Sequence, residues 1–162
     1  MAQESPVLSG GEEIRRMRVG DLDQVMDIEV VSFPTPWSRE AYRREIADNS
    51  YAHYLVMLAG GEIIGYGGMW VVLDEAHVTN LAVTPARQRQ GCGRRLLSAL
   101  IELAAALGAD RLTLEVRRSN RAAQMLYLQH GFVACGARRN YYADTQEDAV
   151  VMVKEGLRTG RR

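Results

Sequence analysis

The chain has 162 residues, of which 47% are hydrophobic and 25% charged, a composition typical of one globular domain large enough to bury a core. Its formal net charge is zero, which removes any global electrostatic argument for nucleic-acid binding. Two cysteines and three scattered histidines show no metal-ligand spacing, and no apolar run approaches the roughly 20 residues that cross a membrane, so we expect no metal and no membrane segment.

Hydrophobic periodicity and turn residues predict six elements in the first half of the chain. The segment EIRRMRV predicts a strand, and a helical pattern then runs until the two prolines of FPTPWS (33–38) interrupt it. Ser38 can cap a second helix, and three strands follow, two of them joined as a hairpin at Gly60 and Gly61. In chain order the predicted elements cover residues 13–19, 21–32, 38–46, 52–59, 62–73 and 76–83.

Two helices and three strands are predicted in the second half. A leucine-rich helix ends at Gly108, and Ser119 is expected to cap a later helix that ends at Gly131. The predicted elements cover residues 96–107, 111–116, 120–130, 132–142 and 148–154. Together they predict one α/β domain with a mixed sheet over residues 12–157, between flexible tails at 1–11 and 158–162. The N-terminus has no signal-peptide pattern, and with the composition this favours the cytoplasm.

The stretch RQRQGCGRR (87–95) places four arginines and two glycines at the start of the leucine-rich helix. Arginines are unexpected there, because the positive end of the helix dipole prefers acidic neighbours. Glycines allow close approach to the backbone, and the unpaired N–H groups of a first helical turn form an anion site. The stretch therefore indicates a phosphate site, with a flexible loop of solvated arginines as the alternative.

Two familiar phosphate loops are excluded at this position. A P-loop ends in Gly-Lys-Ser/Thr, which is missing, and the dinucleotide fingerprint needs a third glycine where Leu96 stands. Residues 85–90 also separate the preceding strand from Gly91. The expected ligand is a pyrophosphate held mainly by the backbone, without a catalytic lysine.

The pattern Gln88-x-x-Gly91-x-Gly93 between a strand and a helix resembles the acetyl-coenzyme A loop of the GCN5-related N-acetyltransferase (GNAT) superfamily. The segments FPTPWS, LEVRRSNRAAQMLYLQHGF and RRNYYADTQEDAVVM extend the likeness to the RimI-like bacterial ribosomal-protein-alanine N-acetyltransferases, over roughly residues 14–154. This resemblance implies a single domain with a mixed, mostly antiparallel central sheet flanked by helices. It also implies that acetyl-coenzyme A is the cosubstrate. The implied coenzyme-binding residues are Leu81, Ala82, Val83, Arg89, Gln90, Gly91, Cys92, Gly93, Arg94 and Asn120.

Glu115 and Tyr127 are the candidate catalytic residues. Glu115 lies on the polar face of the strand RLTLEV, where a solvated glutamate is the ordinary alternative. Asn120 and Tyr127 share a helix face, and packing in the core is the ordinary alternative for Tyr127. The resemblance implies that Glu115 is the general base and Tyr127 the general acid. Neither Cys92 nor Cys135 is needed as a nucleophile, and His77 is expected to be an ordinary strand residue.

The resemblance also implies that the acceptor is the N-terminal segment of a ribosomal protein, acetylated on the α-amine of its alanine. The acceptor would lie between the loop 33–38 and the turn 137–148. Acidic side chains there could attract a basic peptide; they are Asp74, Glu75, Asp144, Glu147 and Asp148. An exposed hairpin with tyrosines is the alternative for the second segment.

Three other functions remain open from the sequence. One is acetylation of a small-molecule amine or of lysine, which a closed acceptor pocket would favour. Another is a coenzyme A-binding regulatory module, although such a module needs neither Glu115 nor Tyr127. A nucleic-acid binder is the weakest alternative because the net charge is zero.

Overall fold

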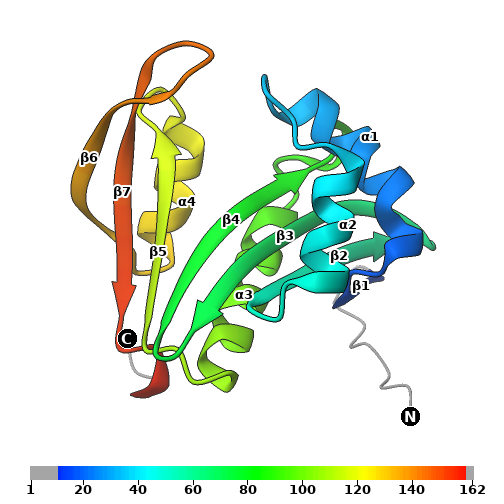
Figure 1. Ribbon diagram of the computed structural model, residues 1–162, viewed down its shortest axis with the longest axis horizontal. Coiled ribbons are helices and arrows are strands. Elements are labelled where there is room, and N and C mark those ends of the chain that lie inside the picture. The colour runs from blue at the N-terminus through cyan, green and yellow to red at the C-terminus, as the bar shows by residue number, and fades with distance from the viewer. Residues whose placement is uncertain (1–10, 160–162) are drawn as a thin grey trace. The chain divides into compact units, whose positions relative to one another are not determined.

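A computed structural model of the protein describes residues 11–159. The predicted tail residues 1–10 and 160–162 lie outside this range. Eleven main elements follow in the order β1 Glu12–Arg16, α1 Leu22–Ser32, α2 Arg39–Asp48, β2 Ala52–Ala59, β3 Glu62–Val72, β4 Glu75–Val83, α3 Cys92–Ala106, β5 Arg111–Arg117, α4 Arg121–Gln129, β6 Val133–Tyr142 and β7 Glu147–Glu155 (Figure 1).

The strands form one mixed sheet with the order β1-β2-β3-β4-β5-β7-β6. The pairs β1–β2, β5–β7 and β6–β7 are antiparallel, whereas β4 and β5 are parallel. The parallel ladder is short, because it joins only Glu75–His77 to Arg111–Thr113. This matches the predicted α/β fold with a mixed, mostly antiparallel sheet.

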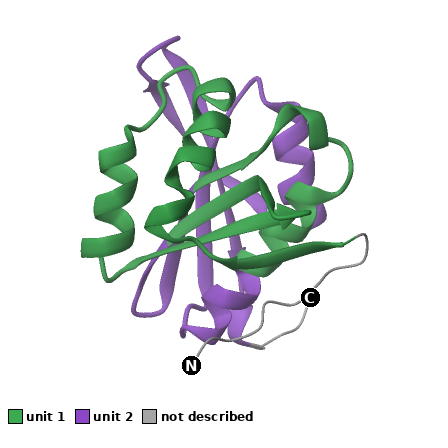
Figure 2. Ribbon diagram, turned by 90° about the vertical axis from the view of Figure 1, so that its right-hand side faces the viewer, with its two compact units in different colours: residues 1–69, 80–100 green, residues 70–79, 101–162 purple. Residues whose placement is uncertain are grey.

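The chain divides into two compact units (Figure 2). The described part of the first comprises residues 11–69 and 80–100, and that of the second comprises residues 70–79 and 101–159. Strands β3 and β4 each contribute residues to both units.

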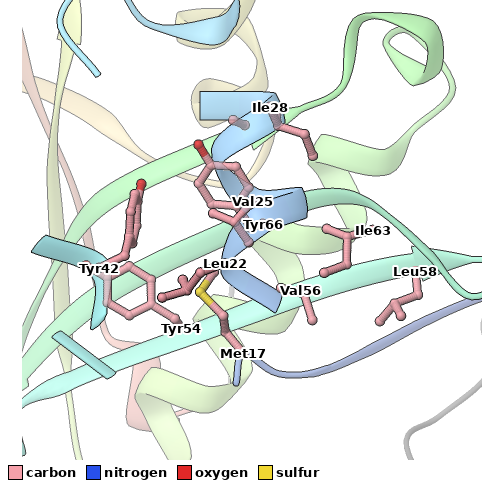
Figure 3. Close-up of a cluster of buried hydrophobic side chains, with 11 residues drawn as sticks. Met17, Leu22, Val25, Ile28, Tyr42, Tyr54, Val56, Leu58, Ile63 and Tyr66 are labelled. Carbon is pink, nitrogen blue, oxygen red and sulfur yellow. The ribbon is translucent and has the colours of Figure 1, made fainter. Parts of the chain in front are cut away.

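The first unit is built around a tyrosine-rich core between β2, β3 and the helices α1 and α2. Leu22, Val25 and Ile28 form the buried face of α1, at the spacing expected for an amphipathic helix. Tyr42 of α2 and Tyr66 of β3 are completely buried beside them (Figure 3). Further members of this core are Met17, Tyr54, Val56, Leu58, Ile63 and Ala82.

Helix α3 approaches β3 closely within the first unit, and glycines make this possible. A Cβ on Gly65 would lie 2.9 Å from Leu96 Cδ1, and one on Gly67 would lie 2.8 Å from Leu100 Cδ1. Real Cβ atoms do not come this close, so any larger residue would displace the leucine side chains, and glycine lets the leucine face of α3 reach the sheet.

The second unit contains β5, α4 and the antiparallel pair β6–β7. Leu112, Leu114 and Val116 of β5 are buried, and Thr113 and Glu115 between them are partly exposed, as the alternation predicts. The side chain of Gln124 joins α4 to the end of β5 by donating to the carbonyls of Arg117 and Arg118.

The cap of α4 differs from the predicted one. Asn120, not Ser119, is the N-cap residue, and its Oδ1 accepts a hydrogen bond from the Ala123 amide at 3.1 Å. Ser119 instead donates its backbone N–H to Glu147. Both residue types are good caps, so the sequence could not distinguish two adjacent candidates.

Candidate functional site

Glu115 is the central carboxylate of the second unit. Its side chain is only 9% exposed, although it lies on the less buried face of β5. It follows the last paired residue of the β4–β5 ladder, Thr113, by two positions. The carboxylate is therefore held at the point where the parallel pairing has ended, rather than solvated on an open strand face.

The side chains of His77 and Arg138 contact this carboxylate. His77 Nε2 lies 2.6 Å from Glu115 Oε1, and Arg138 Nε lies 3.4 Å from Oε2. The hydrogen bond from His77 is the largest influence and, with Arg138, holds the pKa of Glu115 below its ordinary value despite the opposing effect of burial. Glu115 is therefore ionised at neutral pH, as a proton acceptor must be.

Tyr127 lies on α4 in the same unit and is 8% exposed. Its ring packs against Phe132, with the ring centroids 5.7 Å apart. Burial raises the pKa of Tyr127 to about 12, so its hydroxyl keeps its proton at any physiological pH. Within the described residues that hydroxyl has no hydrogen-bond partner, so it is available to donate to a bound molecule.

The turn between β6 and β7 is organised by Arg117. Its guanidinium donates to Asp144 at 2.8 Å, lies 3.6 Å from Glu147, and stacks 4.0 Å from the centre of the Tyr142 ring. Asp148 is in turn 3.6 Å from Arg118. Three of the carboxylates that we expected to attract a basic peptide are thus ion-paired, which reduces the charge they can offer to an acceptor.

The arginine-glycine turn lies in the first unit, at the start of α3. Arg89 and Gly91 have positive φ angles of 65° and 83°, and the helix begins at Cys92. The N–H groups of Cys92 and Gly93 belong to the first helical turn, where backbone N–H groups have no intrahelical acceptor. This geometry fits the predicted backbone cradle for phosphates.

Arg95 does not belong to that cradle. Its Nη2 donates to Glu12 of β1 at 2.6 Å and to Cys92 Sγ at 3.6 Å. Cys92 is 2% exposed and Glu12 is 6% exposed, so the contact ties the buried side of α3 to the first strand. Arg95 thus has a carboxylate partner of its own, unlike the phosphate-facing or solvated arginines expected for the stretch 87–95.

Residues 81–83 form the end of β4 in the first unit. Ala82 is buried, Leu81 and Val83 are partly exposed, and the carbonyl of Val83 accepts from the Gln88 side chain at 3.1 Å. The Thr84 amide donates to the carbonyl of Ile64 at 2.8 Å. The strand end that precedes the arginine-glycine turn is therefore fixed by one side-chain and one backbone hydrogen bond.

A family model described as "Acetyltransferase (GNAT) family" matches residues 22–132. The chain belongs to this acetyltransferase family. The [ribosomal protein bS18]-alanine N-acetyltransferase of Escherichia coli (strain K12) is 40% identical over 143 residues, which cover 86% of this chain and 94% of the relative. A Bacillus subtilis (strain 168) relative is 44% identical over 139 residues, 86% of this chain and 92% of its own, and its name assigns the same activity provisionally.

A solved structure agrees with these relatives. The crystal structure of the ribosomal-protein-S18-alanine N-acetyltransferase from Escherichia coli superposes with a TM-score of 0.82 at 36% sequence identity. The match covers 89% of this chain and 93% of that one. The GNAT resemblance predicted from the sequence is thus confirmed, as is the fold class.

Another buried carboxylate of the acetyltransferase, Glu29 of α1, lies in the first unit. Glu29 is 1% exposed and accepts hydrogen bonds from the Tyr42 hydroxyl at 2.6 Å and from the Tyr66 hydroxyl. Its other oxygen accepts the backbone N–H of Trp37 at 2.8 Å. Asn80 donates to the Tyr42 hydroxyl at 3.0 Å. Through the Trp37 N–H, this Glu29 cluster holds the end of the loop 33–38, which we predict to face the acceptor.

The structure places the predicted site residues in two sets. Glu115, Tyr127 and Asn120 lie in the second unit, whereas the residues of the arginine-glycine turn and of 81–83 lie in the first. The contact of Glu115 with His77 and Arg138 was missed, because it depends on the pairing of strands that are distant in sequence. Within residues 11–159, no group of side chains is suited to hold a metal ion, and no helix is long and apolar enough to cross a membrane.

Proposed function

We propose that this acetyltransferase transfers the acetyl group of acetyl-coenzyme A to the N-terminal α-amine of a ribosomal protein that begins with alanine. The relatives named for this reaction span nearly the whole chain, which supports the acceptor class. The observation that carries the chemistry is the ionised, largely buried Glu115 on β5. The acceptor would place the enzyme in the cytoplasm.

Glu115 has the properties required of the general base in this reaction. The acceptor amine arrives as an ammonium and must lose a proton before its lone pair can attack the acetyl carbon. Because Glu115 is ionised at neutral pH, it can accept that proton directly or through one water molecule. No residue of the enzyme has to be acylated, so Cys92 and the exposed Cys135 need no catalytic role.

Tyr127 supplies the complementary proton as general acid. The leaving group is a thiolate, which a phenol can protonate as the carbon–sulfur bond breaks. The high pKa of Tyr127, raised to about 12 by burial, ensures that the proton is present. The lack of a competing partner for its hydroxyl among the described residues supports the same role.

Acetyl-coenzyme A fits the turn at the start of α3. The pyrophosphate would accept N–H groups of the turn and first helical residues, namely Arg89, Gln90, Gly91, Cys92, Gly93 and Arg94. The backbone of Leu81, Ala82 and Val83 would lie along the acetyl and pantetheine groups, where its N–H groups can stabilise developing negative charge on oxygen. Asn120 would contact the coenzyme with atoms other than the Oδ1 that caps α4.

An α-amine suits a single glutamate base better than a lysine side chain does. The pKa of an α-amino group is near 8, against about 10.4 for lysine. Removing the proton at neutral pH is therefore easier by roughly 2.5 pKa units, or about 3.4 kcal/mol.

The test uses purified enzyme, acetyl-coenzyme A and two matched peptides. One is a basic peptide that begins with a free alanine, and the other has the same sequence with a blocked N-terminus and one internal lysine. Mass spectrometry that localises the acetyl group to the α-nitrogen of the first peptide supports the proposal. Equal acetylation of the blocked peptide would contradict it and favour lysine or small-amine acetylation.

A further inference from the structure

The imidazole of His77 forms the shortest polar contact made by Glu115, and the proposed mechanism does not use it. His77 Nε2 and Glu115 Oε1 are 2.6 Å apart. The two side chains differ in their access to water, because His77 is 38% exposed and Glu115 is 9% exposed. The inference below rests on the function proposed above and concerns what happens to the proton that Glu115 removes.

The contact fixes how the imidazole is protonated. An ionised carboxylate only accepts hydrogen bonds, so the proton between the two atoms belongs to Nε2 of His77. In the neutral ring the other nitrogen, Nδ1, then carries a lone pair. Among residues 11–159, Nδ1 has no hydrogen-bond partner, which leaves it free to bind a proton.

We propose that Glu115 and His77 act as one base, in which Glu115 draws the proton from the acceptor ammonium and His77 holds it as an imidazolium until water removes it. A carboxylate that is 9% exposed is thereby paired with an imidazole that is 38% exposed and can pass a proton to solvent. In such a pair the carboxylate orients the imidazole and stabilises its protonated form.

The proton balance is simple. An N–H bond of the ammonium breaks, and its electron pair remains on the nitrogen that attacks the acetyl carbon. The proton passes through Glu115 and bound water to Nδ1, while Nε2 keeps its own proton directed at Oε1. The imidazolium formed is paired with the Glu115 carboxylate, and Nδ1 then releases its proton to bulk water, which restores the starting state.

Two side chains of β6 lie near the Glu115 carboxylate. Arg138 of β6 lies 3.4 Å from the second oxygen of Glu115, and Tyr141 of β6 is close enough for its pKa to be raised, first by burial and then by Glu115. Neither side chain makes a hydrogen bond or ion pair with the imidazole among the described residues. Glu115 is thus the hydrogen-bond partner of the imidazole among the described residues.

The decisive variant is His77→Gln, because the glutamine amide can still donate to Glu115 but cannot bind a proton. We expect kcat at pH 7 to fall about 10²-fold, with the KM for acetyl-coenzyme A unchanged. The pH–rate profile of the variant should differ from that of the wild type, because the glutamine amide has no nitrogen that binds a proton. The titration of the acceptor amine is common to both enzymes, so the difference between their profiles isolates the imidazole.

Two further variants complete the experiment. His77→Ala opens a space at a partly exposed position, so added free imidazole should restore part of the lost turnover. His53→Gln is the matched control, since His53 contacts Arg16 in the first unit and should leave kcat and its pH profile unchanged. Circular dichroism and thermal melting verify that each variant is folded.

The outcomes separate this inference from the proposed function. A His77→Gln enzyme with wild-type kcat and an unchanged pH profile would overturn the inference, as would an alanine variant that free imidazole does not rescue. Failure of the wild-type enzyme to acetylate any alanine-initiated peptide would overturn the proposed acceptor instead. The histidine variants would then be measured on the amine that the enzyme does acetylate.

Discussion

Glu29 and Glu115, two largely buried glutamates of this acetyltransferase, differ in the kind of partner that each one has. Glu29 receives two tyrosine hydroxyls and a backbone N–H, all permanent donors that do not exchange charge with solvent at neutral pH. Glu115 contacts an imidazole and an arginine, and both of these side chains reach water. We therefore expect Glu29 to be structural and Glu115, whose partners reach solvent, to take part in proton transfer.

The tyrosines of the two units show the same contrast. The hydroxyls of Tyr42 and Tyr66 are committed to Glu29, and burial raises the pKa of both. Burial also raises the pKa of Tyr127, but its hydroxyl has no partner among the described residues. Removing a hydroxyl should consequently cost stability in the first unit and activity in the second.

The largest effect is expected from Glu115→Gln, which removes the carboxylate that is proposed to accept the proton. Turnover at neutral pH should fall about 10³-fold, within the range for loss of a general base. The loss should shrink at high pH, where more of the acceptor is already a free amine. Affinity for acetyl-coenzyme A, measured by calorimetry, should be nearly unchanged. A pH–rate profile parallel to that of the wild type would remove Glu115 as the base.

Glu29→Ala should instead destabilise the fold. It leaves two buried hydroxyls and the Trp37 N–H without their acceptor, and we expect unfolding free energy to fall by about 3 kcal/mol. Urea denaturation measures the change. Glu40→Ala, at an exposed position of α2, is the control and should leave the unfolding free energy nearly unchanged. If Glu29→Ala were as stable as that control, Glu29 could not be regarded as structural.

Tyr127→Phe tests the uncommitted hydroxyl. It keeps the ring that packs against Phe132, so the melting temperature should hardly change. Turnover should fall about 10²-fold, the scale for one positioned proton donor. Steady-state kinetics and thermal melting on the same sample check both parts. Wild-type rates in the phenylalanine variant would assign Tyr127 to packing alone.

The smallest effect is expected from Tyr66→Phe, the matching change in the first unit. Glu29 keeps its hydrogen bonds from Tyr42 and Trp37, so the loss should be about 1 kcal/mol of unfolding free energy. Turnover per folded molecule should remain within about twofold of the wild type. A large loss of kcat with unchanged stability would show that the two units do not divide their roles in this way.

The secondary structure could be predicted almost completely, because its signals are local. Alternation in RLTLEV, the leucine spacing of α3 and the proline break at 33–38 each depend on a few neighbouring residues. The observed strands and helices begin and end within a few residues of the predicted ones. The cap of α4 was missed because Ser119 and Asn120 are adjacent and equally suited to capping.

The candidate site could be predicted only in part. The arginine-glycine turn was found from its own residues, and the family resemblance marks Glu115 and Tyr127, but the roles of all three remain predictions. The partners of Glu115 could not be found, because strand order and register bring His77 and Arg138 to it from two other strands. The same reason hid the pairing of Arg95 with Glu12, which are 83 residues apart.

The ion pair between Glu12 and Arg95 has a practical consequence for shortened forms of this protein. Glu12 lies near the beginning of the described chain, so it is easily removed when an N-terminal segment is trimmed for crystallisation or fusion. A chain that starts after Glu12 would leave the Arg95 guanidinium without its counter-charge, next to the turn proposed to hold the coenzyme. Trimming should therefore stop before this residue, and affinity tags or fusion partners belong ahead of it.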